Sequence, residues 1–129
     1  MRRLALTALV LACPCVALEV PLSTATGGQP AIDIRDAQGR TVSCIVDSGA
    51  MQAVLSPSLA ASDPGHALGQ VHATGAGGSV LLPSWQVEGW QLGDHQLPDF
   101  AALLMDLGTA TPCVLGLSVF GSPRVELDF

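Results

Sequence analysis

The alternation of apolar and polar residues in the first half of the chain predicts a β-hairpin. Residues 31–36 and residues 40–47 each alternate as half-buried strands do, and a short turn with a glycine separates them. In the second of these strands Val42, Cys44 and Val46 share one face, because side chains two residues apart point the same way. This face is therefore expected to lie in the core.

The same pattern predicts further short elements. Residues 19–24 are expected to form a first strand, and residues 51–56 an extended segment that leads into a helix over residues 58–62. Residues 70–85 are expected to form a second hairpin with a glycine-rich tip at residues 75–78. An ordinary flexible turn is the simplest interpretation of that tip.

Two more strand regions are expected at residues 84–92 and 96–107. Trp85 and Trp90 are five residues apart, so on a regular strand they would face opposite sides, one in the core and one at the surface. Residues 103–105 are expected to belong to the core of the sheet.

Residues 1–17 have the pattern of a secretory signal peptide, which leaves residues 18–129 as one domain. Two arginines precede an apolar run over residues 4–16, and this run is shorter than the roughly 20 residues that span a membrane. Export to the periplasm or cell envelope, or secretion, is the expectation.

A second interpretation of the leader predicts a lipid anchor. The segment Val10-Leu11-Ala12-Cys13 resembles a bacterial lipobox, in which cleavage precedes the cysteine and a lipid is attached to it. In this case association with a membrane is expected through Cys13, and a leader that stays uncleaved and serves as an anchor is the remaining alternative.

Charge and composition argue against nucleic acid as a partner. Removal of Arg2 and Arg3 with the leader leaves three basic against 11 acidic residues, a net charge of −8. No basic stripe is present, and aromatic residues that could stack on bases are few.

The predicted hairpin delivers a carboxylate to a tight loop. Asp47 ends an apolar strand, Ser48 can bond the backbone locally, and Gly49 permits backbone angles closed to other residues. A local Asx turn at the end of a strand would explain the same residues. Near the C-terminus a second motif runs apolar, Gly116, apolar.

The order and spacing of these two motifs resemble the retropepsin-like aspartic proteases, the single-lobe family that includes retroviral proteases and bacterial relatives. The resemblance implies an all-β acid-protease barrel, a mobile flap at the glycine-rich hairpin and a short C-terminal helix that starts at residues 117–120. It also implies a terminal strand at residues 124–129.

The resemblance further assigns roles to individual residues. It implies that Asp47 is catalytic, that Ser48 stiffens the loop across a dimer axis, and that Gly49 keeps the loop tight against the substrate backbone. The implied substrate-binding residues are Ala50, Gly75, Ala76, Gly77, Gly78, Val114 and Leu115. Met51 departs from the family pattern, which often has a polar residue there.

An aspartic protease needs two facing carboxylates, and this chain has one Asp-Ser-Gly. The resemblance therefore implies a homodimer with twofold symmetry in which each chain contributes Asp47. The implied substrate is a peptide or protein, and neither a cofactor nor a metal is expected.

Other functions remain alternatives. A catalytically silent domain of the same fold could bind peptide or a partner protein, and a structural envelope domain would need no peptide site. A Ser-His-Asp triad lacks the Gly-x-Ser-x-Gly elbow, and the three histidines lack metal-ligand spacing. The other aspartates on turns and polar strand positions are expected to be solvated. These are Asp33, Asp36, Asp94, Asp99 and Asp106.

Cys44 and Cys113 are expected to be neighbours. Each lies three residues before a motif residue, Asp47 or Gly116, and the family resemblance places the two motif strands side by side. Either a disulfide or two buried thiols would fit this placement.

Overall fold

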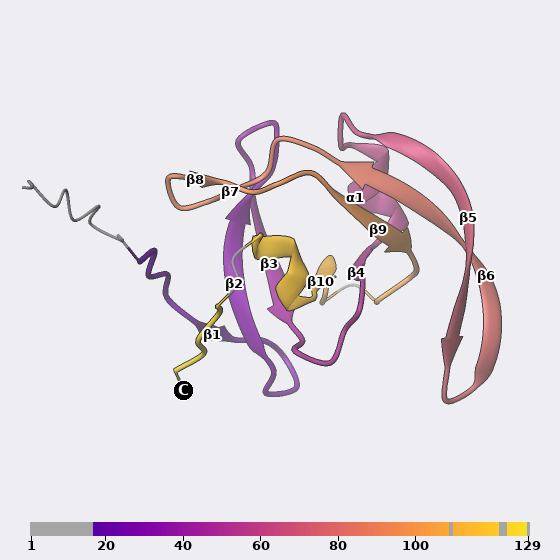
Figure 1. The fold of residues 1–129 in the computed structure, drawn as a ribbon, viewed down its shortest axis with the longest axis horizontal. Helices are drawn as coiled ribbons and strands as arrows, with labels where there is room; N and C mark the ends of the chain where they lie inside the picture. Colours follow the sequence, from indigo (N-terminus) through magenta and orange to yellow (C-terminus); the bar gives the residue numbers. More distant parts are fainter. Residues whose placement is uncertain (1–16, 109, 122–123, 129) are drawn as a thin grey trace, which may run out of the picture.

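A computed structural model describes residues 17–108, 110–121 and 124–128, and it is an all-β fold (Figure 1). The strands form one sheet in the order β5-β6-β9-β4-β10-β3-β2-β7-β8, with β1 beside β2. The elements are β1 (Ser23–Thr24), β2 (Pro30–Arg35), β3 (Thr41–Val46), β4 (Ala53–Leu55), α1 (Pro57–Ala61), β5 (His66–Gly75), β6 (Gly78–Val87), β7 (Gln91–Leu92), β8 (His95–Gln96), β9 (Phe100–Leu104), β10 (Cys113–Leu115) and the 3₁₀ helix η1 (Leu117–Phe120).

The centre of the sheet brings distant segments together. β10 pairs in parallel with β3 and antiparallel with β4, and β4 pairs in parallel with β9. Because β3 and β10 run in parallel, the loops that follow them leave the sheet at the same end. These are the loops of the two sequence motifs.

Both expected hairpins are present. β2 and β3 pair antiparallel, and the side chains of Val42, Cys44 and Val46 are buried as predicted. β5 and β6 form the second hairpin, with their ends at Gly75 and Gly78. The core on which they pack also includes Ile34, Leu55, Val87, Trp90 and Leu115.

The two helices are short and begin where the sequence predicts. At α1 the Ser56 hydroxyl accepts a hydrogen bond from the N–H of Leu59, and Pro57 occupies the first turn, where a missing N–H costs nothing. The C-terminal helix is the single 3₁₀ turn η1. Among the described residues no helix is both long and apolar enough to cross a membrane.

Several expected boundaries differ in the structure. The first strand is limited to β1, and residues 124–128 have no regular secondary structure instead of forming a terminal strand; Phe129 lies outside the described residues. Of the expected core residues 103–105, Leu103 is buried, but the Met105 side chain is 41% exposed because β9 ends before it. The leader, residues 1–16, also lies outside the described part of the chain.

The prediction for the two tryptophans is right for Trp90, which is buried in the core, but wrong for Trp85, which is half-buried against the same core instead of facing the opposite side. β6 ends at Val87, and the chain turns at Gly89, which has a φ of 73°. Because the strand does not continue, the indoles of Trp85 and Trp90 converge on one carboxylate, that of Asp63. The sequence prediction assumed one regular strand through both tryptophans, and this assumption leaves out the turn at Gly89.

Asp36 is also not solvated as expected. It is 4% exposed, and its Oδ2 accepts a hydrogen bond of 2.7 Å from Nε of Arg40. Its Oδ1 accepts the backbone N–H groups of Gln38 and Arg40, each at 2.9 Å. Burial raises the pKa of Asp36, but these hydrogen bonds and the Arg40 charge outweigh burial, and the net pKa lies below its ordinary value.

Candidate active site

Asp47 stands exposed at the mouth of the loop that follows β3. Its backbone N–H donates to the carbonyl of Leu115 in β10 at 2.9 Å, which continues the pairing of the two motif strands. Its Oδ1 accepts the N–H of Gly49 at 2.9 Å, and its carbonyl accepts the N–H of Ala50 at 3.1 Å. The Asx turn is thus real, and it holds the carboxylate of Asp47 at a defined place in solvent. Ser48 and Gly49 are exposed beside it.

The second motif packs directly against this loop. Gly116 has an ordinary φ of −80°, so its backbone would accept any residue. A Cβ on Gly116, however, would collide with the carbonyl oxygen of Ala50. The absence of a side chain at Gly116 therefore allows the two motif loops to touch.

A disulfide lies beneath the two loops. Cys44 in β3 and Cys113 in β10 are register partners, their Cα atoms are 4.9 Å apart, and both are fully buried. The prediction that they are neighbours is confirmed, and the equal spacing to Asp47 and Gly116 is the reason they meet at one level.

The β5–β6 hairpin forms one wall of an apolar groove of about 370 Å³. Besides side chains of the hairpin, the lining includes Val54 of β4, Leu103 of β9 and Met105 just after β9. Aliphatic side chains and the backbone of the hairpin tip supply the lining, which suits the side chains of an extended peptide.

The predicted substrate-binding residues differ in their exposure and in whether they line the groove. Gly75, Gly77 and Gly78 line the groove, and Ala76 is exposed at the hairpin tip. Val114 is half-buried in β10, and Leu115 is fully buried in the core. Ala50 is half-buried against Gly116. Contact of these residues with a substrate stays a prediction.

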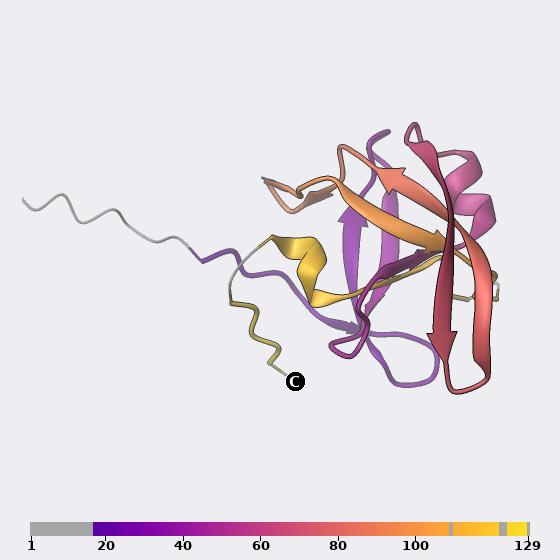
Figure 2. The ribbon, with the colours of Figure 1, turned by 45° about the vertical axis from the view of Figure 1, so that its right-hand side comes forward.

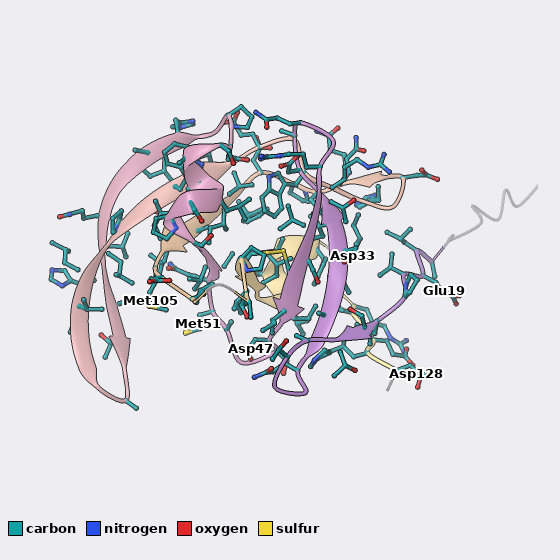
Figure 3. All side chains as sticks on the ribbon, turned by 180° about the vertical axis from the view of Figure 1, so that it is seen from behind. Glu19, Asp33, Asp47, Met51, Met105 and Asp128 are labelled. Carbon is teal, nitrogen blue, oxygen red and sulfur yellow. A yellow bond between two sulfur atoms is a disulfide. The ribbon has the colours of Figure 1, made fainter. Side chains whose placement is uncertain are left out.

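Two methionines flank the approach to the groove, and sequence reasoning did not anticipate their exposure. Met51, four residues after Asp47, is 92% exposed, and Met105 lines the groove. Figure 3 shows Asp47, Met51 and Met105 following one another across the face beside the hairpin. The carboxylate therefore has apolar surface next to it.

The described residues include no group of three or more His, Cys, Asp or Glu side chains placed to hold a metal. The loop after β3 therefore offers the carboxylate of Asp47 as its reactive group, and each chain supplies one such carboxylate.

Comparison with known proteins agrees with this arrangement. A protein-family model described as aspartyl protease matches residues 33–119. The match begins in β2 and ends in η1, so it includes both motif loops and the β5–β6 hairpin. A search of curated proteins finds no match.

Proposed function

The chain belongs to the aspartyl protease family, and we propose that it is an aspartic endopeptidase whose active site joins Asp47 from each of two identical chains. One observation carries the proposal. A solvent-exposed Asp47 is held in a motif loop that packs against the second motif, and Met105, which lines the apolar groove beside the β5–β6 hairpin, lies on the same face (Figure 3).

The proposed reaction is hydrolysis of a peptide bond by water. Two facing carboxylates share one proton, because two like charges that close cannot both ionise cheaply. The ionised carboxylate takes a proton from water, whose oxygen attacks the carbonyl carbon, while the protonated one donates to the carbonyl oxygen. In the collapse of the tetrahedral intermediate, the carboxyl group that took the proton from water donates it to the nitrogen, the C–N bond breaks, and a hydroxyl group of the intermediate returns its proton to the other carboxylate.

The proposed substrate is an extended peptide with apolar side chains near the bond that is cut. The groove has aliphatic walls from Val54, Val80 and Leu103, so burial of an apolar side chain there is favourable and burial of a charge is not. The glycines at the hairpin tip permit close approach of the peptide backbone.

Export is proposed for the compartment. The leader has the pattern of a signal peptide, and the buried Cys44–Cys113 disulfide is of the kind that persists in oxidising compartments. Lipid attachment at Cys13 is the alternative form of export.

The test is cleavage of a peptide library at acid pH, with and without a statine-type inhibitor of aspartic proteases. Asp47→Asn keeps the shape of the loop but cannot share a proton, so activity should fall at least about 10³-fold. Asp106→Asn is the matched control, because Asp106 is also exposed and its Oδ1 also accepts a backbone N–H two residues on, from Gly108 at 2.9 Å. Equal activity of Asp47→Asn and wild type would refute the proposal.

Peptide binding without hydrolysis is the second candidate. The groove is complete within one chain, whereas the carboxylate pair needs two. Saturable binding of apolar peptides by a protein that cleaves none, with equal affinity in Asp47→Asn, would favour this candidate.

A further inference from the structure

A buried carboxylate gathers three donors at the base of the β5–β6 hairpin. Asp63 is 8% exposed. Its Oδ2 accepts Nε1 of Trp85 and the backbone N–H of Gly65, each at 2.9 Å, and its Oδ1 accepts Nε1 of Trp90 at 3.0 Å. These contacts join the end of α1 to β6 and to the segment after it.

This cluster leaves little freedom to the start of the hairpin. A buried carboxylate is costly unless hydrogen bonds satisfy it, so each donor that is lost carries a penalty. Gly65 directly precedes β5, and a Cβ there would collide with the Gln86 carbonyl oxygen, the Asp63 carboxylate and the Trp85 indole. The residue just before β5 is thus tied to the body of the protein.

The outer part of the hairpin, residues 69–83, pairs with no strand outside the hairpin. In β6 the residues from Ser84 to Val87 pair with β9, but residues 78–83 pair only with β5. The register of the hairpin shifts between Ala67 and Gly69, and Gly69 has a φ of 98°. In Figure 2 the outer part reaches beyond the end of β9. The part of the hairpin that is paired with β9 and the part that is not meet at Gly69 and Ser84, which are register partners.

We propose that Asp63 is a positioning residue that clamps the base of the hairpin, so that residues 69–83 move over the groove as one lever about Gly69 and Pro83. Without the clamp the base would also move, and the hinge at Gly69 and Pro83 would no longer keep its place relative to Val54 and Leu103 on the opposite wall. The consequence for peptide hydrolysis rests on the proposed function, but the mechanical claim does not.

Hydrogen exchange of Asp63→Asn tests the mechanical claim. The amide of asparagine presents an N–H₂ group to donors that met an oxygen, so at least one of the three hydrogen bonds is lost. Amides of β5 and β6 should exchange about tenfold faster while amides of β2 and β3 change little. The matched control is Ile34→Val, which removes a buried methylene from β2 and should not accelerate the hairpin selectively.

An equal acceleration of the hairpin and of β2–β3 in Asp63→Asn would overturn the inference, because it would indicate only global destabilisation. Trp85→Phe removes one donor and leaves the carboxylate, so it serves if Asp63→Asn does not fold. It should show the same selective acceleration at a smaller amplitude.

The catalytic readout separates the two proposals. In an active enzyme, Asp63→Asn should raise KM about fivefold with kcat within about twofold, because the hairpin holds the bound peptide and not the reacting atoms. An unchanged KM would argue against positioning. Inactivity of the wild type would instead refute the proposed function, and the exchange data would still decide the role of Asp63.

Discussion

Gly116 shows that a glycine can be required for space alone. Its φ of −80° is open to every residue, and what excludes a side chain is the Ala50 carbonyl oxygen in the facing loop. The contact couples the residue that follows β10 to the loop that carries Asp47, so the geometry of the carboxylate depends on Gly116.

Gly116→Ala should therefore cost about 1–3 kcal/mol, as overpacked sites do, and should displace the Asp47 loop. The measurement is urea unfolding together with activity on a peptide. Gly75→Ala is the control for unfolding alone, because no atom lies within 4 Å of a Cβ at Gly75 and its φ is not positive, whereas its place in the groove excludes it as a control for activity. A Gly116→Ala protein as stable as Gly75→Ala would contradict the account of this contact.

Asp36 is the residue whose ionisation is linked to stability. Burial alone would raise its pKa, but hydrogen bonds from the backbone and side chain of Arg40 and from the backbone of Gln38 lower it below the ordinary value of 3.8. Its charged form is thus favoured by folding. The contribution is complete at a pH above the ordinary carboxyl pKa and is lost as pH falls through the lower pKa of the folded state.

Asp36→Asn should cost about 2 kcal/mol at neutral pH and progressively less as pH falls below the ordinary value, because the wild type then loses the same contribution. Urea unfolding at several pH values measures the difference. Asp33→Asn, at an exposed position of β2, the strand that ends just before Asp36, should show no such dependence. A constant difference across the acid range would show that the Asp36 charge is not the cause.

The sequence was enough to single out residues that are unusual in their local sequence. It was not enough to single out residues whose role depends on contacts with distant parts of the chain. Asp47 and Gly116 stand out because an aspartate after an apolar strand and a glycine between apolar runs are locally unusual. Asp63 and Asp36 look like ordinary turn residues. Their burial depends on Trp85, Trp90 and Arg40, which reach them only in the folded chain.

At the scale of elements, β10 is a short strand that joins the two sides of the sheet beneath the motif loops. It has three residues, yet it pairs with both β3 and β4 and accepts the N–H of Asp47. A slip of one residue would turn every side chain of β10 to the other face. The Cys44–Cys113 disulfide joins register partners and thereby fixes this pairing.

The double variant Cys44→Ala/Cys113→Ala should lose about 4 kcal/mol, the chain-entropy estimate for a loop that residues 69 apart close. Urea unfolding of the oxidised proteins gives this value. Excess reductant is the control, because it removes the bridge from the wild type and should shrink the difference. A difference that persists in reductant would assign the loss to packing.

The elements themselves were largely predictable where alternation is regular. β2 and β3 follow from period-two patterns with a glycine in the turn between them, and the β5–β6 hairpin follows from the glycine-rich tip between two strand segments. The end of the strand expected over residues 84–92 was not predictable, because the pattern of side chains does not show that the backbone turns at Gly89. The pairing of β10 with β3 was expected from the family resemblance and not from the pattern of β10, since three apolar residues have no usable periodicity. The pairing of β10 with β4 was not predicted.

At the scale of the whole molecule, the features that a dimer would use lie at one end. Figures 1 and 2 both place the loop after β3, the tip of the β5–β6 hairpin and the segment of residues 124–128 at this end. Residues 124–128 are not a strand within one chain. The proposed dimer would bring the two Asp47 loops together here, and one chain alone would be inactive.

The most direct test mixes wild-type and Asp47→Asn chains at a constant total concentration, high enough for dimers, and lets them exchange. If activity needs Asp47 from both chains, it should follow the square of the wild-type fraction, so an equal mixture should retain about one quarter of the wild-type activity. A mixture that retains about one half, in proportion to the wild-type chains, would show that each chain works alone and would contradict the paired-aspartate account.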